Sequence, residues 1–218
     1  MIMKILITGS SRGIGHAVAL KFLLEGHEVY GLDVLESQIT HDSYHHQICD
    51  ISDVYAMDHI PNLDILINNA GVQNTGKDIE VNLQGTINVT EHYIPYKHLK
   101  SIVMVASVSG HNGAEFPEYV ASKGGMLAYT KNVAKRVAEF GCTCNSISPG
   151  GVITELNRPV MDDPEKWNQI MSLTPLKKWA SCEEIANWIY FMSVNNKSMT
   201  GQDILVDNGE FYDHTFVW

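Results

Sequence analysis

The stretch Thr8-Gly9-Ser10-Ser11-Arg12-Gly13-Ile14-Gly15 decides the fold. It follows the apolar run Lys4–Thr8 (KILIT), which predicts a buried strand, and it opens residues 15–26, which have the apolar spacing of a helix. Glycines in such a turn let backbone N–H groups approach a ligand without a Cβ clash, and the helix start adds a positive dipole end. The sequence therefore predicts a nucleotide phosphate site formed by Gly9, Ser10, Ser11, Arg12, Gly13, Ile14 and Gly15.

An acidic residue at the end of the next predicted strand selects between two dinucleotides. Residues 28–32 (EVYGL) predict that strand, and Asp33 follows it. A carboxylate here accepts hydrogen bonds from both hydroxyls of an adenosine ribose and repels a 2′-phosphate. Asp33 therefore predicts NAD(H). Arg12 supports the alternative, NADP(H), because a guanidinium beside the loop can pair with a 2′-phosphate.

Short apolar runs alternate with helical patterns along the whole chain. Several runs are apolar almost throughout, as in parallel strands that are covered on both faces. This alternation predicts an α/β protein: a three-layer, doubly wound Rossmann fold with a mostly seven-stranded parallel sheet, in a single domain over residues 1–218. The further predicted strands are 46–49, 63–68, 101–105, 143–147 and 203–206, and the further predicted helices are 78–96, 118–140 and 182–193.

The charge balance argues against two classes of partner. The 218 residues carry a formal net charge of −10, whereas nucleic acids and anionic membrane surfaces attract clustered Lys and Arg. No apolar run reaches the roughly 18 residues of a membrane span, and the first residues lack the pattern of a signal peptide. The four cysteines, which form no C-x-x-C pair, are expected to be free thiols of a cytoplasmic protein: Cys49, Cys142, Cys144 and Cys182.

Tyr119 and Lys123, in the run Tyr119-Val120-Ala121-Ser122-Lys123, lie four residues apart and share one face of the predicted helix. A phenol with a pKa of about 10 is a poor proton carrier at neutral pH. A neighbouring ammonium favours the phenolate, and lowering the pKa by about three would take roughly 4 kcal/mol. The pair therefore predicts acid–base catalysis on a carbinol or carbonyl, with Lys123 lowering the pKa of Tyr119.

These motifs together resemble the short-chain dehydrogenase/reductase superfamily, in its compact single-domain branch and among members like the 3-oxoacyl-[acyl-carrier-protein] reductases. Further matching runs are Asn68-Asn69-Ala70-Gly71, Pro149-Gly150-Gly151-Val152-Ile153-Thr154 and Met199-Thr200-Gly201-Gln202. The resemblance implies catalytic roles for Asn82, Ser107, Tyr119 and Lys123. It also implies cofactor contacts from Asp50, Ile51, Asn69, Ala70, Gly71, Tyr119, Lys123, Pro149, Gly150, Val152, Ile153 and Thr154.

Ser107 and Ser109 are alternative candidates for the hydroxyl that binds the substrate oxygen. A hydroxyl after the strand 101–105 can hydrogen-bond a substrate carbonyl and the oxyanion that develops from it. The spacing to Tyr119 in the resembled family favours Ser107. Asn82 is expected, by the resemblance, to hold a water that connects Lys123 to solvent; the alternative is a buried amide that satisfies a helix kink.

Three regions depart from the resembled family or vary within it. Residues 52–61 and 72–77 are too short for the helices that relatives carry there, so shortened peripheral helices are expected, and a homo-oligomer that is a dimer rather than a tetramer. Residues 155–180 fall where relatives carry a substrate-covering loop, and their apolar side chains suit a lid. The aromatic tail 211–218 is expected to bury itself at the pocket or at a subunit contact.

The sequence thus predicts a cytoplasmic oxidoreductase that moves a hydride between a nicotinamide cofactor and a secondary alcohol or ketone. Its expected partner is a small carbonyl or alcohol substrate, with no nucleic acid, membrane or metal, since the histidines of residues 41–46 have no companion metal ligands. Two alternatives stay open. One is an NADPH-dependent 3-oxoacyl-thioester reductase, and the other is a non-catalytic NAD(H)-binding sensor or scaffold on the same fold.

Overall fold

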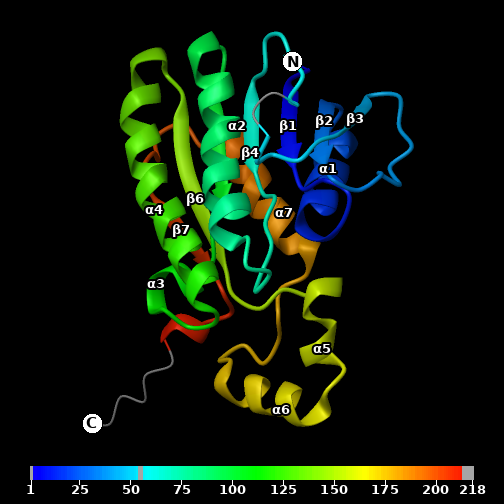
Figure 1. Ribbon diagram of the computed structural model, residues 1–218, viewed down its shortest axis with the longest axis vertical. Coiled ribbons are helices and arrows are strands. Elements are labelled where there is room, and N and C mark those ends of the chain that lie inside the picture. Colours follow the sequence, from blue (N-terminus) through cyan, green and yellow to red (C-terminus); the bar gives the residue numbers. More distant parts are fainter. Residues whose placement is uncertain (1, 54–55, 213–218) are drawn as a thin grey trace.

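The computed structural model describes residues 2–53 and 56–212. These residues form a seven-stranded sheet in the order β3-β2-β1-β4-β5-β6-β7, in which every neighbouring pair is parallel (Figure 1). The central strands are buried almost throughout, which is why their sequences are continuous apolar runs. The strands are β1 Lys4–Thr8, β2 Glu28–Asp33, β3 Tyr44–Ile48, β4 Ile65–Asn68, β5 Ser101–Val105, β6 Thr143–Pro149 and β7 Asp203–Val206.

The helices of the described residues fall into regular α-helices and short segments of other types. The α-helices are α1 Gly13–Leu24, α2 Thr86–Tyr93, α3 Ser109–Asn112, α4 Pro117–Val137, α5 Arg158–Met161, α6 Pro164–Leu173 and α7 Cys182–Tyr190. The π-helical segments are Ile79–Gly85 and Phe191–Asn195, and the 3-10 segments are Ile94–Tyr96, Ala138–Phe140, Glu155–Asn157 and Glu210–Tyr212.

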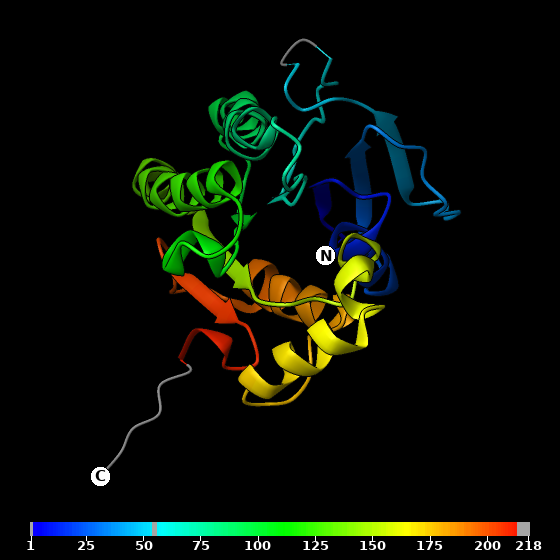
Figure 2. The same cartoon turned by 60° about the horizontal axis from the view of Figure 1, so that its bottom comes forward.

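Helices cover both faces of the sheet. On one face, α1 and α7 pack against each other and against the strands, and Phe22 and Ile185 are fully buried in that layer. On the other face, α2 and α4 pack on the sheet around Tyr93 and Met126. The structure confirms the predicted three-layer, doubly wound fold (Figures 1 and 2). Because both faces are covered, the sheet supplies one continuous core on each side.

Local signals set the helix starts. At α7, the Ser181 hydroxyl accepts the N–H of Glu184 and the Glu184 carboxylate accepts the N–H of Ser181, which is a capping box. At α6, the Asp163 side chain accepts two N–H groups of the first turn, ahead of Pro164. No side chain caps α1, so its first N–H groups remain available to a ligand.

The β2–β3 edge of the sheet carries less helix than its centre. Loop 34–43 joins β2 to β3, and residues 49–64 join β3 to β4; the described parts of both contain turns and no helix. Residues 72–77 are likewise a loop. The expectation of shortened peripheral helices is therefore confirmed.

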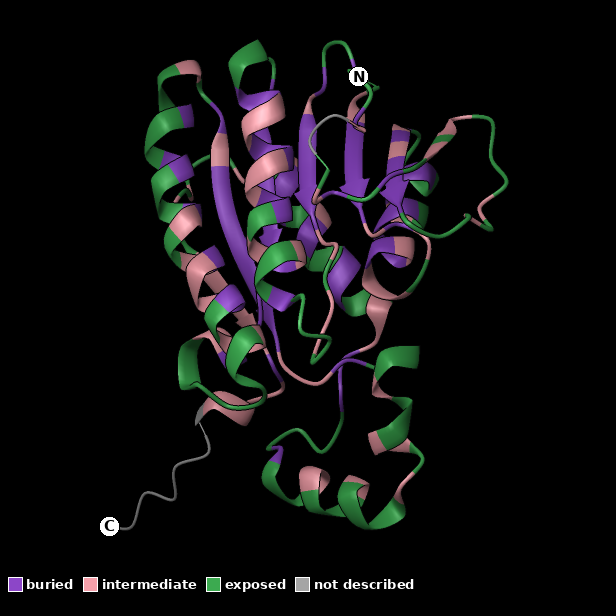
Figure 3. Cartoon of the chain, in the orientation of Figure 1, coloured by how far each residue is buried: buried purple, intermediate pink, exposed green. Residues whose placement is uncertain are grey.

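A lid-like segment stands at the end of the molecule toward which the strands point (Figure 1). It consists of α5 and α6, which contain no fully buried residue, and Figure 3 shows both in exposed and intermediate colours. Trp167 of α6 packs edge-on against the buried Trp179, with ring centroids 5.0 Å apart. This contact anchors a segment that otherwise packs loosely.

Two sequence expectations concern residues away from the cavities. The thiols of Cys142 and Cys144 are buried in one core cluster, as expected for small hydrophobes, and burial raises the pKa of Cys142 to about 12. Most of the aromatic tail, residues 213–218, lies outside the described residues.

Within the described ranges, no helix combines the length and apolar character that a bilayer crossing needs.

Candidate active site

Two adjoining cavities lie along the carboxyl ends of the strands, the edge where doubly wound folds bind ligands. The first, of about 740 Å³, is lined by the glycine loop, Asp33 and Asp50; we call it the glycine-loop cavity. The second, of about 510 Å³, is lined by Ser107, Tyr119 and Lys123; we call it the tyrosine cavity. One ligand can extend from one to the other, because they share lining residues: Ile14, Asn69, Gly71, Val72, Gln73, Thr154 and Leu156.

The glycine loop is tied to the loop after β4. Gly9 has a φ of 68°, in the left-handed region that glycine adopts without Cβ strain. The Thr8 hydroxyl accepts the backbone N–H groups of Asn69 and Ala70, each at 3.0 Å. The Asn69 amide donates to the carbonyls of Thr8 and Gly9, also at 3.0 Å. A Cβ on Gly15 would overlap the Gly9 carbonyl oxygen, so α1 can pack this closely on the turn only with glycine there.

The walls of the glycine-loop cavity fit a dinucleotide. Gly13, with a φ of 57°, lines the cavity, and a Cβ there would meet nothing nearer than the Thr154 methyl group at 3.7 Å, so the space in front of the α1 start is open. Farther along, the Asp33 carboxylate accepts the N–H groups of Ser11 at 2.9 Å and Leu35 at 3.0 Å. These bonds fix the carboxylate in the wall and leave lone pairs for two ribose hydroxyls.

Helix α4 brings Lys123 and Tyr119 to the tyrosine cavity. Lys123 is only 4% exposed; its Nζ donates to the Val105 carbonyl at 2.9 Å and lies 5.6 Å from the Tyr119 ring centroid. Burial lowers the pKa of Lys123 to about 8, and the negative charge of Glu115 opposes this change. An ammonium has three donors, so hydrogens remain for ligand hydroxyls.

The pKa of Tyr119 departs from the sequence-based expectation. Burial raises the pKa of Tyr119 to about 12; a hydrogen bond with Ser107 lowers it, and the charges of Glu115 and Asp78 raise it. Without a bound cofactor, the pKa of Tyr119 is therefore raised above its usual value, not lowered as the neighbouring Lys123 led us to expect. The reason is that burial disfavours the charged lysine as well, and its ammonium is directed to a backbone carbonyl.

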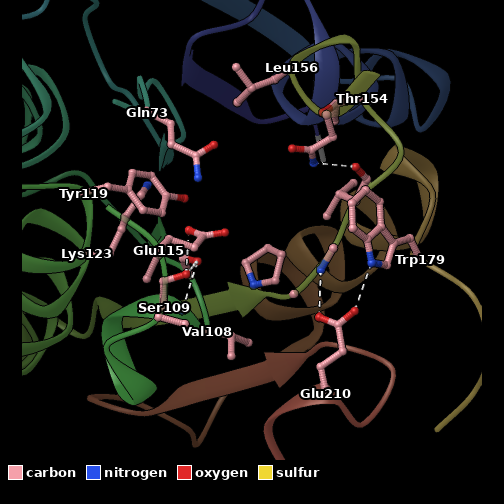
Figure 4. A pocket seen from close by; sticks show the side chains of 18 of the residues that line it. Gln73, Val108, Ser109, Glu115, Tyr119, Lys123, Thr154, Leu156, Trp179 and Glu210 are labelled. Atoms are coloured by element: carbon pink, nitrogen blue, oxygen red, sulfur yellow. Dashed lines mark hydrogen bonds between the residues drawn. The ribbon is translucent and has the colours of Figure 1, made fainter. Parts of the chain in front are cut away.

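A chain of hydroxyls links Tyr119 to a carboxylate. The Ser107 hydroxyl hydrogen-bonds the phenol and donates to Ser109 Oγ at 3.2 Å. Ser109 Oγ in turn donates to Glu115 Oε2 at 2.7 Å. Figure 4 shows the Glu115 and Tyr119 side chains directed into the same space. Of the two competing serines, Ser107 contacts the phenol and Ser109 contacts the carboxylate.

Asn82 is buried, and the protein itself uses its amide. Its Oδ1 accepts the Val72 N–H at 2.7 Å, and its Nδ2 donates to the Val72 carbonyl at 2.8 Å and to Ser122 Oγ at 3.1 Å. It lies in the π-helical segment Ile79–Gly85, a type of helix distortion that is frequent at functional sites. The side chain thus holds loop 72–77 against α4, which matches the alternative prediction of a satisfied amide at a helix irregularity.

Most predicted site residues line the two cavities, and a few do not. The Ser10 hydroxyl hydrogen-bonds the Tyr44 hydroxyl at 3.0 Å, and the Ile153 side chain is 46% exposed. Outside the cavity walls lie Ser10, Ser11, Gly15, Asn82 and Ile153. In the walls lie Gly9, Arg12, Gly13, Ile14, Asp33, Asp50, Ile51, Asn69, Ala70, Gly71, Ser107, Tyr119, Lys123, Pro149, Gly150, Val152 and Thr154.

Two carboxylates in the tyrosine cavity, Glu115 and Glu210, were not predicted from the sequence. Glu210 Oε1 accepts Trp179 Nε1 at 2.9 Å and Thr174 Oγ1 at 3.1 Å. Its Oε2 accepts the Gly151 N–H at 3.1 Å (Figure 4). Glu210 thus joins the loop after β6 to the base of the lid. No local pattern marks it, because its partners are distant in the sequence.

The cleft has a glycine loop and acidic side chains at one end and a phenol beside an ammonium at the other. This arrangement suits hydride transfer coupled to proton transfer, the chemistry of nicotinamide-dependent dehydrogenases and reductases. A family model described as Enoyl-(Acyl carrier protein) reductase matches residues 9–210. The chain belongs to this family, within the short-chain dehydrogenase/reductase superfamily that its motifs resemble.

Known relatives are similar to this chain over nearly its whole length. The 3-oxoacyl-[acyl-carrier-protein] reductase FabG of Thermotoga maritima is 32% identical over 238 residues, with 94% of this chain and 96% of that protein covered. The ligand-free aldohexose dehydrogenase of Thermoplasma acidophilum superposes with a TM-score of 0.87 at 27% identity, covering 96% of this chain and 94% of that one. A 4-hydroxyisoleucine dehydrogenase complexed with NADH gives 0.86 at 28% identity, covering 95% and 98%. The protein is accordingly an NAD(P)-dependent oxidoreductase acting on alcohol or ketone groups.

Proposed function

We propose that this protein is an NAD(H)-preferring dehydrogenase/reductase of small secondary alcohols or ketones, built as one domain, in which Tyr119, Lys123, Ser107 and Asn82 serve proton transfer. The observation that carries this proposal is that the Tyr119 phenol and the buried Lys123 line a cavity that adjoins the glycine-loop cavity and shares lining residues with it. When bound, the nicotinamide supplies the carbon that accepts or gives the hydride and, in its oxidised form, a positive charge that favours the phenolate.

Each residue has its own task in this proposal. The Tyr119 phenol moves the proton to or from the substrate oxygen. Ser107, which hydrogen-bonds that phenol, holds the substrate oxygen and stabilises the charge that develops on it. Lys123 binds ligand hydroxyls with its remaining hydrogens and stabilises the phenolate once it forms. Both hydrogens of the Asn82 side-chain amide are donated to Val72 and Ser122. A proton relay at Asn82 would therefore use one of its own carbonyl oxygens as acceptor.

A panel assay tests this function. Purified protein is mixed with NAD⁺ or NADP⁺ and secondary alcohols, or with the reduced cofactors and ketones, and the absorbance of the reduced nicotinamide is followed. Turnover with NAD(H) is expected. If no member of the panel reacts while NADH still binds, the non-catalytic sensor or scaffold becomes the better description.

Asp33→Asn is expected to shift the cofactor preference toward NADP(H) by about tenfold or more. Two like charges about 4 Å apart repel by about 4 kcal/mol at a near-surface effective dielectric, and solvent screening leaves a part of that, whereas tenfold needs only about 1.4 kcal/mol. Arg12, which lines the same cavity, remains to pair with a 2′-phosphate.

Fluorescence titration of NADH and NADPH measures the ratio of dissociation constants in the Asp33→Asn variant. The matched control is Asp42→Asn, which removes an exposed charge outside the cavity and leaves the ratio unchanged. An Asp33→Asn protein that keeps the wild-type ratio would show that Asp33 does not select the cofactor.

We further propose that α5 and α6 close over the substrate. Leu156 and Leu173 line the tyrosine cavity, yet their side chains are 62% and 55% exposed, so a bound substrate would let the segment bury them. Amide hydrogen exchange of residues 155–173 is expected to slow when a reduced cofactor and a ketone are added together. Equal exchange with and without these ligands would argue against closure.

A second candidate is an NADPH-dependent 3-oxoacyl-thioester reductase. It is supported by the relative from Thermotoga maritima, which is named a 3-oxoacyl-[acyl-carrier-protein] reductase. Arg12 in the cavity wall supports NADPH. A 3-oxoacyl thioester with NADPH in the same assay separates the two candidates, because this substrate should outperform simple ketones only if the second is right.

The quaternary structure and the location are also proposals. A homo-oligomer, a dimer rather than a tetramer, is supported by exposed apolar side chains such as Trp188 and Phe191 at the end of α7 and just beyond it. A cytoplasmic location is supported by cysteines that remain free thiols. Sedimentation analysis and cell fractionation would contradict these proposals by finding a monomer or an exported protein.

A further inference from the structure

Glu115 is a strained residue in the tyrosine cavity to which the proposed chemistry gives no task. Its φ of 80° lies in the left-handed region, which is strained for a residue with a side chain. Its carboxylate is directed into the cavity from the loop before α4, on the same side as Tyr119 (Figure 4). Strain of this kind persists mainly at active sites and ligand clamps, where the surroundings hold the residue in place.

The charges that line the cavity are unbalanced. Among the described lining residues, the ionisable groups are Glu115, Glu210, Tyr119 and Lys123, with no arginine or histidine. Glu210 is occupied by three hydrogen bonds to the lid base and the loop after β6. Apart from Tyr119 and Lys123, Glu115 is therefore the ionisable side chain that a bound substrate would meet. A substrate with a carboxylate or phosphate near its reacting carbon would be repelled.

Glu115 keeps acceptor capacity for a ligand. Ser109 donates to its Oε2 at 2.7 Å, and the Gln73 side chain also hydrogen-bonds the carboxylate. An ionised carboxylate offers about four lone-pair sites, so about two remain. Glu115 is exposed toward the open cavity, while partial burial of its carboxyl raises the pKa. A donor on a bound ligand would stabilise this carboxylate when the ligand displaces solvent from it.

We propose that Glu115 selects substrates that carry a hydrogen-bond donor, a hydroxyl or an ammonium group, on the carbon next to the reacting carbinol or ketone. Vicinal diols, sugars and amino alcohols present such a donor. A 3-oxoacyl thioester carries a methylene group on that carbon and an acceptor oxygen on the next one, and neither offers the carboxylate a hydrogen-bond donor. This inference rests on the proposed function and narrows it to a substrate class.

The test compares four ring alcohols of similar size: cyclohexanol, cyclohexane-1,2-diol, 2-aminocyclohexanol and 2-hydroxycyclohexanecarboxylate. Wild-type kcat/KM with NAD⁺ is expected to be roughly 10- to 100-fold higher for a donor-bearing alcohol than for cyclohexanol, and lowest for the carboxylate. Comparing kcat/KM for the diol with that for the amino alcohol shows whether Glu115 prefers a neutral or a cationic donor. In Glu115→Gly the advantage should fall to about 1- to 3-fold, chiefly through KM. Glu115→Gln should raise the relative rate of the carboxylate.

Two features make the variants informative. Glycine is at ease at a φ of 80°, so Glu115→Gly removes the side chain without adding strain and should fold normally. Glu118→Gln is the charge-matched control, because Glu118 is exposed and lines neither cavity. Turnover with the same diol-to-cyclohexanol ratio in wild type and Glu115→Gly overturns this inference alone. No turnover with any arm overturns the proposed function, and the inference falls with it.

Discussion

Tyr119→Phe is expected to lower kcat by about 10²- to 10⁴-fold, the range that general acid–base catalysis contributes. The change removes one oxygen from a ring that is otherwise held by α4 and the cavity wall, so the dissociation constant of NADH should stay within a few-fold of wild type. Turnover is measured with the best substrate of the panel, and cofactor binding by fluorescence titration.

The control for this variant is Tyr129→Phe on the same helix. The Tyr129 hydroxyl donates to Glu91 at 2.7 Å and lines neither cavity, so its loss should leave kcat unchanged. A Tyr119→Phe protein with wild-type kcat would remove the proton carrier from the proposed mechanism. Burial raises the pKa of Tyr119 to about 12 in the protein alone, and the positive charge of bound NAD⁺ should lower it, so the phenol should titrate at lower pH in the complex.

Lys123→Met is expected to lower kcat by roughly 10²-fold or more and to change how stability depends on pH. The kcat effect follows because the charge that stabilises the phenolate is lost. The stability effect follows from burial, which holds the pKa of Lys123 at about 8 in the folded protein against 10.5 in an unperturbed lysine. Between these pH values the unfolded chain binds more protons, so the wild-type protein gains stability as pH rises.

The methionine variant lacks this contribution. Its free energy of unfolding, relative to wild type, should therefore fall by about 2 kcal/mol between pH 8 and pH 10. At neutral pH the two proteins should be of similar stability, since relief from the buried charge is offset by the unpaired Val105 carbonyl, at about 1–3 kcal/mol. Urea unfolding at both pH values measures the difference, with Lys131→Met, an exposed position on α4, as the control. A pH-independent difference would mean that Lys123 titrates normally.

The fold was predictable because its signals are short-range. A buried parallel strand must be apolar throughout, so β1, β4 and β5 could be located to within about two residues. The glycine turn after β1 requires special backbone geometry, and its position in the chain identifies it. The shortened edge of the sheet followed from loop lengths compared with those of the resembled family. The extent of the lid helices did not, since α5 and α6 bury no residue and their apolar spacing carries little information.

The site was predictable where chemistry and sequence spacing coincide. Tyr119 and Lys123 share a helical face by their spacing, and Asp33 ends a strand at the ligand edge. The role of Asn82 in proton transfer was expected only by resemblance, and the contacts of its amide with Val72 and Ser122 were not predictable, because no local pattern reveals them. The carboxylates Glu115 and Glu210 were missed for the same reason.

By itself, the order of residues determined the sheet, the phosphate turn and the helical face that carries the phenol and the ammonium, because each depends on neighbours within a few positions along the chain. Only the tertiary structure decided the electrostatics. Burial of Lys123 and Tyr119 moves both pKa values away from what adjacency alone would give, and loops distant in sequence bring Glu115 and Glu210 to the same cavity. Desolvation and long-range charge depend on what surrounds a group in space, which the linear chain does not specify.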